Sequence, residues 1–110
     1  MTETFTQPGE TETESVPVAP TAETVQVALT WPDADSTFDV TGVRLLAPAR
    51  SLGLYDPTAR SRLRITKRRT PRSLDVRIKN VARGRLVFKI VAKRLDGRTR
   101  VRATIRQSKR

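Results

Sequence analysis

An alternation of apolar and polar residues, which is typical of β-strands, begins near residue 25 and recurs to the end of the chain. In VQVALTW the apolar side chains fall on one face: Val25, Val27, Leu29 and Trp31. FDVTGVRLL also alternates, but its apolar positions change parity around Gly42, which predicts a β-bulge or a close backbone approach there. RLRIT predicts a brief strand, and KRRTPR after it predicts a turn or loop with concentrated positive charge.

The last third of the chain has the clearest strand pattern. SLDVRIK places three apolar residues on one face: Leu74, Val76 and Ile78. RLVFKIVAKRL and RTRVRATIRQ flank Asp96-Gly97, and a two-residue Asp-Gly loop favours the type I′ turn of a β-hairpin. In that register Phe88 lies opposite Ile105. With the NVARGR connection ending at Gly84, three strands present apolar side chains to the same side, which predicts an antiparallel meander.

The fold class follows from these elements. APARSLGLYDPTARSR interrupts the alternation, and Asp56-Pro57 within it predicts either a short helical turn or a surface loop. We therefore expect an all-β fold, a small antiparallel sandwich or barrel of five to six strands with a C-terminal meander.

The N-terminal segment MTETFTQPGETETESVPVAPTAET is rich in Thr, Glu and Pro. It has too few apolar residues to offset the entropy of ordering it, so we predict an extended acidic arm at 1–24, preceding a basic β domain at 25–110. One interpretation is a disordered tail that only aids solubility. The other is an arm that becomes ordered on a neighbouring molecule, which the extended SVPVAP stretch favours.

Charge is sorted along the chain. The sequence holds 22 Lys and Arg against 11 Asp and Glu, a formal net charge of +11. All the cations lie at or after Arg44, whereas only Asp56, Asp75 and Asp96 of the carboxylates follow that position. The C-terminal part is therefore strongly basic and is expected to meet an anionic partner.

A basic face is predicted on the strands and loops of this part. In the hairpin register Lys93 lies opposite Arg100, and directly opposed like charges destabilise a sheet unless an anion lies between them. The alternative is a solvated polar face. The residues of the predicted anion- or partner-binding face are Lys67, Arg68, Arg69, Arg72, Lys89, Lys93, Arg98, Arg100, Arg102 and Arg106.

The residue types argue against catalysis. The sequence has no His and no Cys, so the usual general base, thiol nucleophile and zinc ligands are absent. Asp33, Asp35 and Asp39 form a carboxylate cluster, but PDADSTFD lacks the Gly and the terminal Glu of an EF-hand loop, and a turn with solvated Asp residues is favoured. We predict no catalytic, cofactor or metal site and expect a protein that is not an enzyme.

Two functions are favoured, and the sequence does not separate them from a third, an accessory protein that docks on an acidic host or ribosomal partner. The first is a structural protein of a large assembly, such as a phage-like virion component (head decoration, minor capsid or connector) held by arm exchange and electrostatic contacts with acidic surfaces or copies of itself. The alternative is a sequence-tolerant nucleic-acid-binding module whose acidic arm regulates affinity. No apolar run approaches membrane-spanning length and the N-terminus is acidic, so we expect a place in a virion or, otherwise, in the cytoplasm, with no membrane and no small-molecule substrate as partner.

Overall fold

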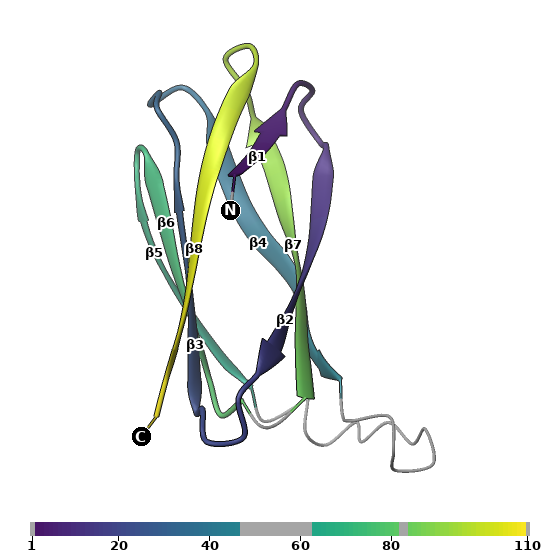
Figure 1. Cartoon of the computed structure of the whole chain (residues 1–110). Helices are drawn as coiled ribbons and strands as arrows, with labels where there is room; N and C mark the ends of the chain where they lie inside the picture. The colour runs from purple at the N-terminus through teal and green to yellow at the C-terminus, as the bar shows by residue number, and fades with distance from the viewer. Residues whose placement is uncertain (1, 47–62, 82–83, 110) are drawn as a thin grey trace.

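The computed structural model describes residues 2–46, 63–81 and 84–109, and these form an all-β fold of two antiparallel sheets (Figure 1). The strands are β1 (Thr2–Phe5), β2 (Thr11–Val18), β3 (Thr24–Thr30), β4 (Thr37–Leu46), β5 (Arg64–Thr70), β6 (Ser73–Lys79), β7 (Gly84–Arg94) and β8 (Thr99–Ser108). The five-stranded sheet has the order β1-β8-β3-β6-β5, and the three-stranded sheet has the order β2-β7-β4. The prediction for Asp56-Pro57 lies outside the described residues.

The two sheets form an open sandwich, and the alternation correctly predicted which side chains fill it. Val25, Val27 and Leu29 of β3 are fully buried, as are Val76 and Ile78 of β6. The inward side chains of β7 complete the core from the other sheet: Leu86, Phe88, Ile90 and Ala92. The inward positions of these three strands are therefore apolar, as expected where two sheets pack face to face.

The extended acidic arm predicted for residues 1–24 is not seen in the structure. Its first part forms β1, which pairs with β8, and its middle part forms β2, which pairs with β7. Phe5 and Val18 are buried in the core. These few apolar side chains are enough to order the segment because the edges of β8 and β7 supply backbone hydrogen-bond partners. The Thr/Glu-rich composition of the segment did not reveal this backbone pairing.

The predicted meander across β6, β7 and β8 is wrong, although the inward faces of its strands were assigned correctly. The segment around Asp96-Gly97 does not join hydrogen-bonded neighbours, because β7 lies between β2 and β4 while β8 lies between β1 and β3. The connection carries the chain from one sheet to the other, and the buried hydroxyls of Ser36 and Thr99 lie 3.3 Å apart beside it. The backbone N–H of Asp96 also donates to Ser36 Oγ. Alternation fixes an inward face but not the sheet that it belongs to.

Two local predictions have different outcomes. The parity change near Gly42 is confirmed: the β4–β7 register shifts between Thr41 and Arg44, and Gly42 has φ of +61°, a conformation that favours glycine. The expected loop KRRTPR is wrong in its first part, because β5 continues to Thr70 and pairs with β6 through a turn at residues 71–72.

Candidate anion-binding surface and the two lateral edges

The structure divides the predicted basic face between the two sheets. Lys67, Arg68 and Arg69 lie on β5 and Arg72 in the turn after it; Lys89 and Lys93 lie on β7; Arg98 precedes β8, which carries Arg100, Arg102 and Arg106. Because β7 and β8 belong to different sheets, the expected pairing of Lys93 with Arg100 does not occur. The outward cations of β7 and those of β8 therefore face opposite sides of the sandwich.

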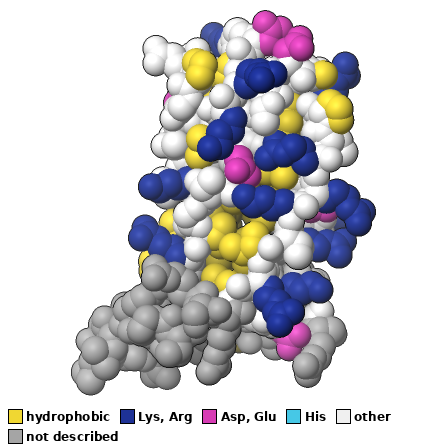
Figure 2. Space-filling view, turned by 180° about the vertical axis from the view of Figure 1, so that it is seen from behind, with side chains coloured by type: hydrophobic (Ala, Val, Ile, Leu, Met, Phe, Trp, Pro, Cys, Tyr) yellow, Lys and Arg dark blue, Asp and Glu magenta, His cyan; other side chains and the backbone are white. Residues whose placement is uncertain are grey.

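The outer face of the five-stranded sheet brings together the larger group of cations. On β6 and β8 these cations alternate with buried residues, and those of β5 pair with the outward residues of β6: Arg64, Arg68, Arg77, Lys79, Arg100, Arg102 and Arg106. Among the described residues the carboxylate on this face is Asp75. Figure 2 shows one side of the molecule, on which Lys and Arg side chains are spread widely and carboxylates are few.

Three of these residues were missed by the sequence prediction: Arg64, Arg77 and Lys79. The signal was present for two of them, because the alternation of SLDVRIK already placed Arg77 and Lys79 opposite the apolar side. Arg64 lies within RLRIT, which was predicted to be a strand but whose two faces were not assigned. Once β6 joins β3 and β5 in one sheet, these residues lie on the same face as the arginines of β8.

The cations flank an uncharged lane along β3. Its outward residues are Thr24, Gln26, Ala28 and Thr30, with β8 on one side and β6 on the other. At about 4.8 Å per strand, the two cationic flanks begin about 10 Å apart. Two shallow hollows open on this face: one of about 220 Å³ lined by Thr66, Lys67, Arg68, Asp75 and Arg77, and one of about 260 Å³ lined by Gln26, Ala28, Thr104 and Arg106. Gln26 Nε2 donates to Asp75 Oδ1 at 2.9 Å, which occupies part of that carboxylate's acceptor capacity.

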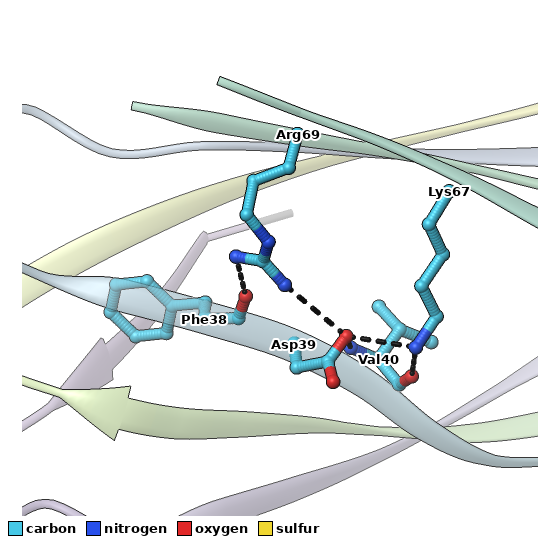
Figure 3. A network of polar contacts seen from close by, with 5 residues as sticks. All are labelled: Phe38, Asp39, Val40, Lys67 and Arg69. Atoms are coloured by element: carbon cyan, nitrogen blue, oxygen red, sulfur yellow. Dashed lines mark hydrogen bonds and ion pairs between the residues drawn. The ribbon is translucent and has the colours of Figure 1, made fainter. Parts of the chain in front are cut away.

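Two predicted anion-binding residues have partners within the chain, at the lateral side formed by β4 and β5, which we call the β4–β5 edge. Lys67 Nζ donates to Asp39 Oδ1 at 2.9 Å and to the Val40 carbonyl at 2.7 Å, and Arg69 Nη1 donates to the Phe38 carbonyl at 2.7 Å (Figure 3). Arg69 Nη2 lies 3.5 Å from Asp39 Oδ1. These contacts link the outermost strands of the two sheets where no backbone ladder joins them.

The electrostatics of Asp39 are consistent with this linking role. Burial acts to raise the pKa of Asp39, but the hydrogen bonds from Lys67 and the Val40 N–H, with the charges of Lys67 and Arg69, lower it below its ordinary value. The carboxylate therefore stays ionised at neutral pH and holds both cations.

The opposite lateral side, formed by β1 and β2 and called the β1–β2 edge, is acidic. Glu3 of β1 pairs with Val101, while Glu12 and Glu14 of β2 pair with Ile90 and Phe88, so all three carboxylates project to the inner side of their strands. Each is partly exposed.

The surroundings of Glu14 at this edge raise its pKa. Burial, then a hydrogen bond with the Glu3 side chain, then the negative charges of Glu3 and Glu12 raise the pKa of Glu14 to about 7. The sequence analysis did not single out these residues, because it placed them on a free arm.

The expected carboxylate cluster of Asp33, Asp35 and Asp39 is not formed. Asp39 is at the β4–β5 edge, and Asp96 lies near Asp33 and Asp35 instead, with one carboxylate oxygen of each within 4.8 Å of the others. Asp33 accepts hydrogen bonds from the backbone N–H groups of Asp35 and Ser36 and from Ser36 Oγ. These bonds give Asp33 a turn-capping role, in line with the expected turn.

No helix in the described part of the chain is long and apolar enough to cross a membrane. Comparison with protein-family models, with curated proteins and with solved structures found no match for this chain.

Proposed function

We propose that the protein is a non-enzymatic nucleic-acid-binding module that contacts the phosphate backbone through the outer face of the five-stranded sheet. The observation that carries this proposal is the density of cations on that face, where seven Lys and Arg side chains from β5, β6 and β8 accompany one carboxylate, Asp75, among the described residues. Phosphates that replace condensed counterions beside such a surface gain affinity from the release of those ions.

The outward side chains of β3 indicate which part of a nucleic acid this face contacts. The lane along β3 carries uncharged, non-aromatic side chains, and the described aromatic residues are buried: Phe5, Trp31, Phe38 and Phe88. Because the described residues of this face include no aromatic side chain on which bases could stack, binding is directed at the backbone and tolerates sequence variation. Arginine side chains from both flanks can converge on a backbone in the lane and offer bidentate contacts to phosphate oxygens.

Fluorescence anisotropy with labelled single-stranded and duplex oligonucleotides tests the proposal. We expect affinity that falls steeply with salt, with a slope lowered by about 0.7 to 0.9 for each phosphate contact removed. Arg102→Ala with Arg106→Ala should lower both affinity and slope. Lys89→Ala with Lys93→Ala, on the other sheet, is the matched control and should change them much less. Unmeasurable binding at about 50 mM salt would exclude the proposal, because phosphate binding is strongest at low ionic strength.

A role as a structural component of a large assembly, such as a phage-like virion protein, is the second candidate. It is favoured by the opposite charge of the two lateral edges, since Glu3, Glu12 and Glu14 lie on one side and the cations of β5 on the other. Exchange of an N-terminal arm is not part of this proposal, because residues of the expected arm form β1 and β2. Assembly would rest on electrostatic contacts between copies or with another acidic surface.

A further inference from the structure

The two lateral edges of the sandwich differ in charge and lie on opposite sides of it. On one side Glu3 of β1 and Glu14 of β2 project to the inner side of their strands, and Gln107 Nε2 of β8 donates to the Pro17 carbonyl farther along that side. On the other side, Lys67 and Arg69 join β5 to β4. Because these pairs terminate the two sheets, each side has strands with one unpaired edge.

The β1–β2 edge has an excess of negative charge that the single chain leaves poorly compensated. Glu3, Glu12 and Glu14 all project to the inner side of this edge, and burial, together with the interaction of Glu14 with Glu3 and the charge repulsion from Glu3 and Glu12, raises the pKa of Glu14. A cation placed against the edge from outside would relieve this repulsion and favour the ionised form of Glu14.

The β4–β5 edge offers such cations. Every residue of β5 is exposed, and Arg64 and Arg68 project from its outer side while Lys67 and Arg69 hold the carbonyls of β4. The same strand carries Ile65, whose side chain is 42% exposed although it is large and apolar. An exposed apolar side chain on a strand rich in cations is suited to a contact with a partly apolar, acidic surface.

We propose that copies of this protein dock side by side, with the β1–β2 edge of one copy against the β4–β5 edge of the next. The inference rests on the second candidate function and gives it a specific contact. The contact is heterologous, because an acidic surface meets a basic one, so repetition produces a ring or an open filament.

The contact is made by side chains and does not extend the backbone ladder. Pro17 lacks an N–H and interrupts the free edge of β2, and the Lys and Arg residues of β5 discourage close pairing with another strand. Attraction between the edges therefore depends on charge and weakens as salt rises.

Sedimentation velocity on the nuclease-treated full chain tests the inference, with protein concentration varied at low and at high salt. Two double variants reverse one edge each: Glu12→Lys with Glu14→Lys, and Arg64→Glu with Arg68→Glu. We expect the native chain to associate at low salt and to dissociate at high salt. Each variant alone should remain monomeric, because its two edges no longer have opposite charge. An equimolar mixture of the two variants should associate, since the reversed edges then complement one another.

Several results would overturn the inference. A native chain that stays monomeric at low salt counts against both the contact and the second candidate function. A native chain that associates while either variant associates equally well shows that assembly uses another surface, which removes the contact alone. A mixture that stays monomeric, while circular dichroism shows that both variants are folded, also removes the contact. Because nucleic acid is absent, none of these results bears on binding by the five-stranded sheet.

Discussion

Replacing Phe5 by Ala tests whether the N-terminal segment belongs to the folded core. The Phe5 ring is fully buried, with its centroid 5.2 Å from that of Phe38, which in turn lies 5.0 Å from Trp31. Truncation of a buried Phe costs about 3 to 5 kcal/mol through lost burial and the cavity left behind. Since a domain of this kind has about 5 to 15 kcal/mol in total, Phe5→Ala should remove a large part of its stability.

Urea unfolding followed by tryptophan fluorescence measures this loss. Trp31 is the one Trp in the sequence and lies in the same aromatic group as Phe5, so its emission follows the relevant region. With a slope of about 1 to 3 kcal/mol per molar urea, the midpoint should fall by about 2 M. Thr4→Ala on the outer side of β1 is the control and should change stability by no more than about 0.5 kcal/mol. A Phe5→Ala midpoint equal to that of the native chain would refute the placement of β1, because a solvated arm loses nothing on truncation.

Three other predictions use the same unfolding measurement. The free energy of unfolding should fall by about 1 kcal/mol as pH rises from about 4.5 to about 7, because the folded state holds the Glu14 proton more tightly than the unfolded state does. Glu14→Gln should abolish this fall. A fall that persists in the variant would show that another group causes it. Lys67→Ala should lower stability by about 1 kcal/mol through loss of its hydrogen bonds to β4, whereas Arg68→Ala on the outer side of the same strand should have little effect; equal effects would contradict the linking role. Gly42→Ala should cost about 1 kcal/mol because φ of +61° strains any residue with a Cβ, and an unchanged midpoint would argue against this bulge geometry.

Local pattern predicted the buried side chains well but the strand neighbours poorly. Alternation in β3, β6, β7 and β8 reflects a property of each strand alone, namely which side is apolar, and it predicted the bulge at Gly42 for the same reason. Whether β7 and β8 pair in one sheet or face each other across the core depends on the other strands that occupy their edges. Those strands include β1 and β2, which were not predicted as strands because their sequence is rich in Thr and Glu.

Because the predicted pairing of β7 with β8 was wrong, the predicted grouping of the cations was wrong as well. The arginines of β8 were correctly placed on an outward face, but the hairpin register joined them to Lys89 and Lys93, which the structure places on the other sheet. Lys67 and Arg69 look like free cations in a basic run, and only the position of β4 shows that they reach its carbonyls. The density of cations was therefore predictable from sequence, but their grouping depended on contacts between distant segments.

The acidic and basic segments of the sequence are also separated in space, because β1 and β2 lie at the opposite ends of the two sheets from β5 and β4. Had these acidic strands been placed beside β5, their carboxylates would have neutralised its cations within one molecule. They lie instead at the far end of both sheets, so the acidic and basic edges cannot meet within a single chain. Glu14 remains crowded by like charges, and the outer face of the five-stranded sheet keeps its excess of cations. The two proposed interactions share Arg64 and Arg68 of β5, so reversal of Glu12 and Glu14 is the change that separates them: it alters the acidic edge and leaves every cation of the five-stranded sheet in place.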